Sequence, residues 1–191
     1  MANSQLWNFA SERGMESGMG NIVLVGFMGT GKSTVAEALA RRLGWTKIDL
    51  DAKIEEEEGR TISQIFAEHG EPYFRQVETA MLRKALEGQS GQIIATGGGA
   101  VLAEENRRLM LKHAFVVALT ADEQTIVQRV KDDPNRPLLQ GDVAQRVRLL
   151  MEQRRDAYRF APVQIDTADK EVDEIADIII ERWRSARGGQ A

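Results

Sequence analysis

Residues Gly26 to Thr34 combine glycines, a lysine and hydroxyl side chains at a fixed spacing, Gly-Phe-Met-Gly-Thr-Gly-Lys-Ser-Thr. The run fits the pattern G-x-x-x-x-G-K-[ST], in which glycines let backbone N–H groups turn inward around an anion. It follows the apolar run Ile22–Val25 and precedes a helical pattern, so that the positive end of a helix points at the same place. The lysine can reach nucleotide phosphates and the serine can bind Mg²⁺. The pattern predicts a phosphate-binding loop.

Two aspartates follow at a spacing of two residues, Asp49 and Asp51, in the run Lys47-Ile48-Asp49-Leu50-Asp51. On a strand, residues two apart leave the same face, and open α/β sheets bind ligands at the carboxyl ends of their strands. One carboxylate would then hold Mg²⁺ through water while the other accepts a hydrogen bond from a substrate hydroxyl. The alternative is structural, because Asp51 is also well placed to cap a helix over residues 52–58.

Three consecutive glycines, Gly97, Gly98 and Gly99, come directly after the apolar run Ile93–Thr96. Without side chains they allow a substrate or another backbone segment to approach closely, and their N–H groups can face an anion. A loose turn would give the same pattern. The run therefore indicates a binding loop only in combination with its neighbours.

Two arginines are candidates for binding an acidic substrate. Arg154 falls on an apolar stripe of helical spacing, Val147-Leu150-Met151-Arg154-Tyr158, where a guanidinium is costly unless it meets an anion. Arg75 lies near the start of a predicted helix. A pair of arginines suits a carboxylate, because the planar guanidinium binds it through two hydrogen bonds. Internal pairing is the alternative for both, and Glu78 offers Arg75 a salt bridge at i+3.

A third arginine, Arg136, lies in a polar segment with two prolines, Lys131-Asp132-Asp133-Pro134-Asn135-Arg136-Pro137. Such a segment between predicted helices is typical of a lid, from which an arginine can move onto a transferring phosphate. A solvated loop arginine is the alternative.

The elements that must position these residues alternate between strands and helices. Short apolar runs predict strands over 22–25, 47–51, 93–96, 115–119 and 163–165. Periodicity and capping signals predict helices over 33–43, after Thr61, from Pro72, and over 122–131, 142–159 and 171–185. The alternation predicts an α/β fold with a mainly parallel sheet.

The composition is that of an ordinary globular protein, with 42% apolar and 28% charged residues among 191. The length predicts one domain, 21–187, between an N-terminal tail (1–20) and a C-terminal tail (188–191). The absence of cysteine excludes disulfides and thiolate metal sites and, together with the lack of a signal-peptide pattern, favours the cytoplasm. The net charge of −4 argues against nucleic-acid binding, and no apolar run is long enough to span a membrane. We expect a monomer.

In combination, these motifs resemble the shikimate kinases, which are P-loop enzymes similar to the nucleoside monophosphate kinases. The resemblance covers most of the chain, from about Asn21 to Arg184. It rests on six motifs in order: Gly26–Thr34, Asp49-x-Asp51, Phe74-Arg75, Thr96-Gly97-Gly98-Gly99, Arg136-Pro137-Leu138-Leu139, and Arg154 four residues before Tyr158. The phosphate loop alone is generic, whereas the ordered combination is specific.

The resemblance implies a three-layer P-loop fold with a central five-stranded parallel sheet, a substrate-binding subdomain at about 51–80 and a lid at about 131–142. It implies transfer of the γ-phosphoryl group of ATP to a hydroxyl of shikimate, giving shikimate 3-phosphate for aromatic amino-acid synthesis. Lys32, Asp51 and Arg136 would be the catalytic residues.

The resemblance also assigns the binding residues. Mg²⁺ would bind Ser33 and, through water, Asp49. Arg129 would pack on adenine, and the loop near 166–168 would close the nucleotide site. ATP would be held by Gly29, Thr30, Gly31, Lys32, Ser33, Thr34, Arg129 and Arg136. Shikimate would be held by Asp51, Arg75, Gly97, Gly98, Gly99 and Arg154.

One departure from the family pattern concerns the second arginine. Families of this kind often carry Arg-x-Pro-Leu-Tyr, where this chain has Arg154-Arg155-Asp156-Ala157-Tyr158. Arg155 is therefore a rival for the carboxylate, although the apolar stripe favours Arg154.

Three other functions share the phosphate loop. A nucleoside monophosphate kinase has an acceptor that carries a phosphate, which a nearby aspartate would repel. A gluconate-type sugar-acid kinase is harder to distinguish by its chemistry. A GTP-dependent switch protein needs a guanine-selective motif of the Asn-Lys-x-Asp type, which the sequence lacks. Phosphorylation of shikimate is the function we expect.

Overall fold

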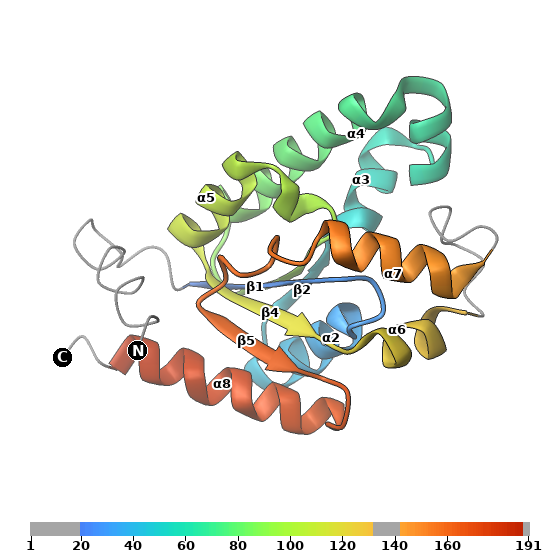
Figure 1. The fold of residues 1–191 in the computed structure, drawn as a ribbon. Helices are drawn as coiled ribbons and strands as arrows, with labels where there is room; N and C mark the ends of the chain where they lie inside the picture. Colours follow the sequence, from blue (N-terminus) through green and yellow to red (C-terminus); the bar gives the residue numbers. More distant parts are fainter. Residues whose placement is uncertain (1–19, 132–141, 189–191) are drawn as a thin grey trace.

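The computed structural model describes residues 20–131 and 142–188. The predicted tail at 1–20 (except Gly20), residues 189–191, Arg136 and almost all of the predicted lid lie outside the described residues. Within them, five parallel strands form a single sheet in the order β2-β3-β1-β4-β5 (Figure 1). The strands are β1 (Asn21–Gly26), β2 (Thr46–Asp49), β3 (Gln92–Ala95), β4 (Phe115–Thr120) and β5 (Val163–Asp166).

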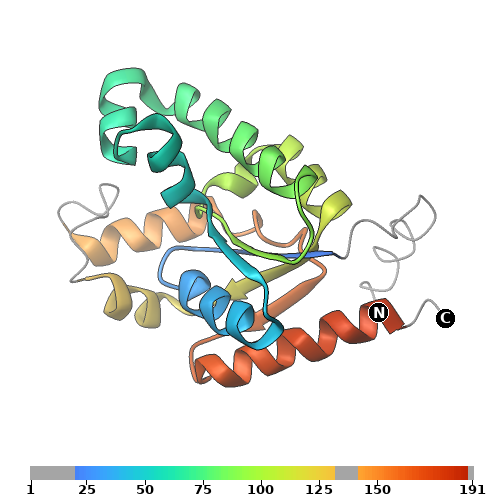
Figure 2. The same ribbon diagram turned by 180° about the vertical axis from the view of Figure 1, so that it is seen from behind.

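Helices cover both faces of this sheet, which confirms the predicted three-layer α/β architecture. One face carries α2 (Lys32–Leu43) and α8 (Val172–Gly188), which lie side by side in Figure 2. The opposite side carries α3 (Leu50–Glu58), α4 (Ile62–Glu87), the short 3₁₀ helix η1 (Ala100–Leu102), α5 (Glu104–His113) and α7 (Val143–Gln153) (Figure 1). Helix α6 (Glu123–Val130) follows β4 and packs against α7.

The central strand β1 shows why the sequence pattern of this sheet is continuous rather than alternating. Ile22 and Leu24 face the core beneath α2 and α8, whereas Val23 and Val25 face the core beneath α4 and α5. All four side chains are fully buried. A strand buried on both faces therefore needs an unbroken apolar run, which is what the sequence shows.

The helices differ from the prediction at α5, at the end of α7 and, as described below, at the start of α3. Helix α5 was not predicted, because its sequence is polar apart from three apolar residues. The helices predicted after Thr61 and from Pro72 are both present within α4, where Gly70 separates them with a non-helical backbone (φ 77°, ψ 173°). The capping box of Thr61 and Gln64 is present as predicted. The predicted helix 142–159 ends early, at Gln153.

No helix among the described residues is both long enough and apolar enough to cross a membrane.

Candidate active site

The phosphate loop joins the carboxyl end of β1 to the start of α2. Gly29 and Gly31 have φ values of 77° and 87°, a region that favours glycine, and a Cβ on Gly29 would lie 2.8 Å from Val130 of α6. The Thr30 side chain is buried and its hydroxyl donates to the carbonyl of Phe27 at 2.8 Å. A hydrogen bond within the loop therefore holds its shape. The loop leads directly into the N-terminus of α2, the arrangement that binds phosphate in such sites.

Lys32 is folded over this loop. Its ammonium group donates to the carbonyls of Gly26 and Phe27, each at 2.9 Å. The positive charge therefore lies at the mouth of the loop, next to the backbone that the resemblance assigns to the phosphates.

Ser33 and Asp49 are brought together from α2 and the end of β2. The Ser33 hydroxyl donates to Asp49 Oδ2 at 3.0 Å. The other oxygen of Asp49 accepts from the backbone N–H of Ala52 at 3.3 Å, so Asp49 caps helix α3. The suggested capping role of Asp51 was wrong, because the helix starts two residues earlier than predicted.

Ser33 and Asp49 are suited to a Mg²⁺ ion that also binds substrate phosphates and water, rather than to a metal held by protein ligands alone. In the described part of the chain, no group of three or more His, Cys, Asp or Glu side chains is arranged to hold a metal ion. Mg²⁺ is typically held by one or two protein oxygens together with substrate phosphates and water. A hydroxyl and a carboxylate in contact beside a phosphate loop supply that donor set.

Asp51 lies in the first turn of α3, not on strand β2 as predicted, because β2 ends at Asp49. Asp49 and Asp51 therefore do not leave the same face of one strand. Helix α3 instead turns its carboxylate toward Gly97, where a Cβ would lie 2.7 Å from Asp51 Oδ1. Burial raises the pKa of Asp51, and the nearby charge of Asp49 raises it further, while Lys32 lowers it.

The three glycines after β3 each lie against a different charged residue. Besides Asp51, a Cβ on Gly97 would lie 3.2 Å from Glu78 Oε1. A Cβ on Gly98 would lie 3.4 Å from Arg154 Nη1, and one on Gly99 would lie 2.7 Å from Arg75 Nη1. A Cβ on Gly97 or Gly99 would displace the Asp51 carboxylate or the Arg75 guanidinium, whereas one on Gly98 would make an ordinary contact. Close approach of charged groups therefore accounts for Gly97 and Gly99.

Arg75 forms the salt bridge with Glu78 that its i+3 spacing predicted. It also faces the segment Gly97–Gly99, called here the glycine loop. Its guanidinium donates to Glu78 Oε2 at 2.7 Å and to Glu71 Oε1 at 3.0 Å. Its carbon Cζ lies 5.2 Å from the centre of the Phe74 ring. These contacts hold the guanidinium beside Gly99, so the structural and the substrate-binding interpretations are compatible.

Glu78 is the site residue that the sequence analysis missed. It is fully buried, and its Oε1 has no hydrogen-bond partner. Burial raises the pKa of Glu78, although Arg75 opposes this. A signal was available, because Phe74, Glu78 and Leu82 are spaced as one buried face of α4, where an isolated carboxylate is unexpected.

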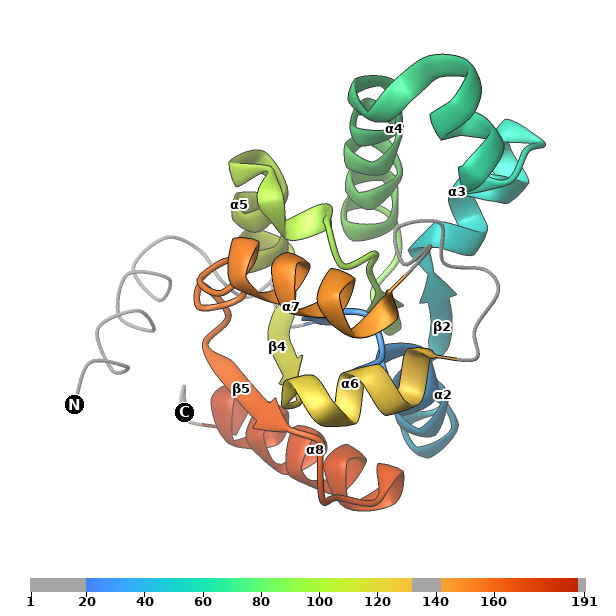
Figure 3. The ribbon, with the colours of Figure 1, turned by 45° about the vertical axis from the view of Figure 1, so that its right-hand side comes forward.

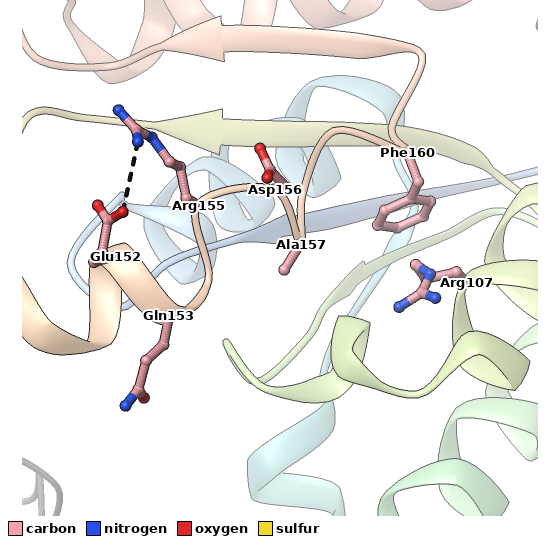
Figure 4. A pocket seen from close by; sticks show the side chains of 7 residues that line it. All are labelled: Arg107, Glu152, Gln153, Arg155, Asp156, Ala157 and Phe160. Atoms are coloured by element: carbon pink, nitrogen blue, oxygen red, sulfur yellow. Dashed lines mark hydrogen bonds and ion pairs between the residues drawn. The ribbon is translucent and has the colours of Figure 1, made fainter.

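Arg154 is the C-cap of α7 rather than a residue within the helix. It is only 8% exposed, and its guanidinium lies 6.0 Å from the centre of the Phe27 ring. Arg155 is exposed and pairs with Glu152 at 3.5 Å. Figure 4 shows this pair at an open hollow of about 600 Å³, also lined by Arg107, Gln153, Asp156, Ala157 and Phe160. Arg154, not Arg155, therefore lies against the glycine loop.

Side chains from two further segments hold the backbone of this loop. The Tyr158 hydroxyl donates to the carbonyl of Gly98 at 2.8 Å. Asn106 of α5 is fully buried and its amide donates to the carbonyl of Ala100 at 2.9 Å. The loop is thus anchored on both sides of Gly99.

Arg129 lies on the nucleotide side, at the end of α6. Its guanidinium donates to the carbonyl of Gly29 at 3.2 Å and to the carbonyl of Thr167 at 2.8 Å. The structure thereby joins α6, the phosphate loop and the segment after β5. Arg136 lies outside the described residues, and Thr34 is exposed in the first turn of α2. The other predicted site residues lie in or against the phosphate loop and the glycine loop.

Comparison of the sequence with known proteins identifies the family of this chain. A family model described as shikimate kinase matches residues 28–184. A shikimate kinase of Geobacter sulfurreducens is 49% identical over 156 residues, 81% of this chain and 86% of that protein. One from Pelotomaculum thermopropionicum is 45% identical over 163 residues, 85% of this chain and 94% of that protein.

Solved structures agree with the sequence relatives. The shikimate kinase from Acinetobacter baumannii in complex with shikimate has a TM-score of 0.83 and 37% identity. The match covers 88% of this chain and 95% of that one. The family model and these relatives cover nearly the whole described fold, and this chain belongs to the shikimate kinase family.

Proposed function

We propose that the protein transfers the γ-phosphoryl group of ATP to a ring hydroxyl of shikimate through the residues assembled at the carboxyl ends of β1, β2 and β3. The observation that carries this proposal is the arrangement around the glycine loop. Two carboxyl groups, Asp51 and Glu78, and two guanidiniums, Arg75 and Arg154, meet three glycines beside a phosphate loop, and Glu78 is paired with Arg75. An acceptor with hydroxyls at one end and a carboxylate at the other matches that pattern of charge.

The donor half of the site neutralises phosphate charge. Phosphoryl transfer depends mainly on positioning and on electrostatic stabilisation of the transferring group. Lys32 supplies a positive charge at the loop mouth, and the inward N–H groups of residues 29–34 bind phosphate oxygens. Arg136 would add a second positive charge from the lid. Ser33 and, through water, Asp49 would hold Mg²⁺, which would supply positive charge that offsets the charge of the phosphates.

The acceptor half of the site orients shikimate. Arg75 and Arg154 bind its carboxylate, and the N–H groups of the glycine loop assist. This fixes the ring so that one hydroxyl points along the line of transfer, which reduces the entropic part of the barrier. Asp51 accepts a hydrogen bond from that hydroxyl and takes its proton as the oxygen attacks phosphorus. The oxygen–phosphorus bond to shikimate forms as the γ-phosphorus separates from the oxygen that joins the β- and γ-phosphates of ATP, and that oxygen leaves with ADP.

An acceptor panel tests the proposal. ADP release is measured with ATP, Mg²⁺ and one of four acceptors: shikimate, gluconate, AMP or CMP. We expect shikimate to exceed the others in kcat/KM by about a hundredfold or more, because a misfit acceptor leaves buried charged groups unpaired. A preference for AMP or CMP would contradict the roles of Arg75 and Arg154, and a preference for gluconate would support the sugar-acid alternative.

The same proposal includes a monomer that acts in the cytoplasm on a small molecule, without nucleic-acid or membrane partners. Sedimentation of the purified protein tests the monomer, and a dimer stable at micromolar concentration would contradict it.

A further inference from the structure

The side chain of Thr167 is buried at the carboxyl ends of the strands, on the nucleotide side of the site. It is 2% exposed and directly follows β5. Its hydroxyl lies 3.1 Å from Nη1 of Arg129, 3.2 Å from the carbonyl oxygen of Thr30 and 3.1 Å from that of Thr120. A single oxygen therefore contacts the phosphate loop, the end of β4 and the last turn of α6.

The contacted residues lie where β1 and β4 end, and Thr167 itself follows β5, so three neighbouring strands meet at this point. Thr30 belongs to the phosphate loop after β1, Thr120 ends β4, and Arg129 lies in the last turn of the helix that follows β4. Figure 3 shows β4 and β5 side by side, with α6 leaving the end of β4 and α8 following β5. The backbone supports the same junction, because the N–H of Thr167 donates to the carbonyl of Thr120 at 2.8 Å.

The chemistry of a hydroxyl fits this position. A threonine hydroxyl has one proton to donate and two lone pairs that accept. It can accept from Arg129 while its proton goes to the carbonyl of Thr30 or Thr120. The carbonyl of Thr167 also accepts from Arg129, at 2.8 Å from Nη2. Together with the bond to Gly29, these contacts hold both terminal nitrogens of the Arg129 guanidinium.

We propose that Thr167 is a positioning residue for ATP, whose hydroxyl holds the carbonyl of Thr30 in the phosphate loop and fixes the plane of the Arg129 guanidinium. The inference rests on the proposed function, in which that loop and that arginine bind the nucleotide. A prearranged loop binds phosphate more tightly, since less conformational freedom is lost on binding. Thr167 would thus act on ATP without touching the reacting atoms.

Thr167→Val tests the inference, because valine keeps the size and branching of threonine and removes only the hydroxyl. We expect the KM for ATP and the Kd for ADP, measured by calorimetry, to rise about tenfold, since the buried Thr30 and the Arg129 guanidinium each lose a hydrogen-bond partner. The KM for shikimate should stay within about twofold of the parent value, because the acceptor residues lie on other segments.

Two further variants separate the hydroxyl from the shape of the side chain. Thr167→Ser retains the hydroxyl and should restore ADP affinity to within about twofold of the parent. Thr120→Val is the matched control: it removes a hydroxyl from the same edge of the sheet, one that donates to Ile165 at 3.4 Å, and it should leave ADP affinity unchanged. If Thr167→Val does not fold, Thr167→Cys gives the same test, because its thiol is a weak hydrogen-bonding group.

A double-mutant cycle shows whether the hydroxyl acts through Arg129. In an Arg129→Ala background, Thr167→Val should weaken ADP binding less than it does in the parent, because the two residues are in direct contact. Equal effects in both backgrounds would remove the part of the inference that concerns Arg129.

Two outcomes would overturn the inference as a whole. One is a Thr167→Val protein with a lower Tm but parental affinity for ADP, which would make the hydroxyl purely structural. The other is a Thr167→Ser protein as impaired as Thr167→Val. Neither outcome affects the proposed function, which fails only if the parent enzyme itself does not phosphorylate shikimate.

Discussion

At the scale of single residues, the site consists of charged groups that are withdrawn from water and face one another. Asp51 and Glu78 both lie close to Gly97, and Arg75 and Arg154 lie beside the next two glycines. Burial raises the pKa of both carboxyl groups. Perturbed groups of this kind concentrate at functional sites, and here they mark the acceptor half.

Replacing Asp51 with asparagine tests its proposed part in the reaction. The amide cannot take a proton and makes weaker hydrogen bonds than a carboxylate, so kcat/KM for shikimate should fall about a hundredfold or more. Calorimetry with ADP should show parental affinity, and the Tm should change little, because Asp49 rather than Asp51 caps the helix. The control Glu56→Gln changes an exposed carboxylate on the same helix, paired with Lys53, and should leave kcat/KM unchanged. An Asp51→Asn enzyme within a few-fold of the parent would return Asp51 to a structural role.

Glu78 makes a prediction about stability and pH. Its pKa lies above the ordinary value of 4.5, so the folded protein keeps this proton to a higher pH than the unfolded chain does. Between those two pKa values the folded state binds more protons, and the contribution of this group to the free energy of unfolding falls as pH rises. Glu78→Gln has no proton to lose. The free energy of unfolding of the variant minus that of the parent should therefore rise from pH 4.5 toward neutral pH.

Urea unfolding across that pH range measures the difference. The groups that face Glu78 are Arg75, Asp51 and Arg154, and none of them is altered in this comparison. Glu71→Gln is the control, because Glu71 is the exposed partner of Arg75 and its loss should cost no more than about 1 kcal/mol. If the free energy of unfolding of Glu78→Gln minus that of the parent stays constant or falls as pH rises, the pKa of Glu78 is not raised in the folded protein.

At the scale of elements, helix ends and one loop do most of the positioning. Helix α3 begins at Leu50 and carries Asp51 in its first turn. Helix α4 bends at Gly70, and its second part carries Arg75 and Glu78. Figure 1 shows α3 and the first part of α4 lying together at one end of the molecule, away from the strands. This matches the place of the predicted subdomain, whose boundaries at about 51–80 stay a prediction.

Tyr158 should act on the glycine loop as a positioning residue. Tyr158→Phe removes the hydrogen bond to the carbonyl of Gly98, and the loop then loses one of its anchors. We expect the KM for shikimate to rise about fivefold while the KM for ATP stays unchanged, in line with the loss of one buried hydrogen bond. Steady-state kinetics with each substrate varied gives both values.

A matched tyrosine provides the control. The hydroxyl of Tyr73 on α4 donates to Glu58 at 3.0 Å, away from the glycine loop. Tyr73→Phe should leave both KM values unchanged. If the two variants behave alike, the bond between Tyr158 and Gly98 does not position substrate.

At the scale of the whole molecule, a sheet buried on both faces supports a site built at the carboxyl ends of its strands. The two cores lie on opposite sides of β1 and together bury most of the large apolar side chains of the described residues. Ion pairs from Arg42 to Asp173 and Asp177 join α2 to α8 on the surface of one layer. We therefore expect the fold to form without a ligand, because its two cores do not include the charged residues of the site.

Because the cores that stabilise the fold are separate from the charged site, we expect loss of metal to affect activity but not folding. Chelation with EDTA should abolish ADP release, because the phosphates then lose the cation that Ser33 and Asp49 would hold. The Tm of the protein without nucleotide should not change, since the described residues contain no metal cage that stabilises the fold. Thermal unfolding with and without EDTA measures this. A large fall in Tm would reveal a structural metal, and retained activity would contradict the metal assignment.

The sequence by itself determined what is local or periodic. The phosphate loop, the five strands, most helices and the identity of the arginines follow from motifs of a few residues or from apolar runs, because these depend on neighbours in the chain. Helix α5 was not predicted, because it has few apolar residues. Its acidic residues in the first turn and basic residues in the last turn did favour a helix. A crossover element was also required between the parallel strands β3 and β4.

Only the tertiary structure decided which groups meet. The caps of α3 and α7 depend on where those helices begin and end, and the sequence pattern placed Asp51 on a strand and Arg154 inside a helix. Glu78 looks like an ordinary salt-bridge partner until the glycine loop lies against its free oxygen. The resemblance placed the loop near 166–168 at the nucleotide site, but the partners of the Thr167 hydroxyl could not be predicted, because they come from other segments. Such contacts bring together residues that are distant in the chain, so local pattern cannot reveal them.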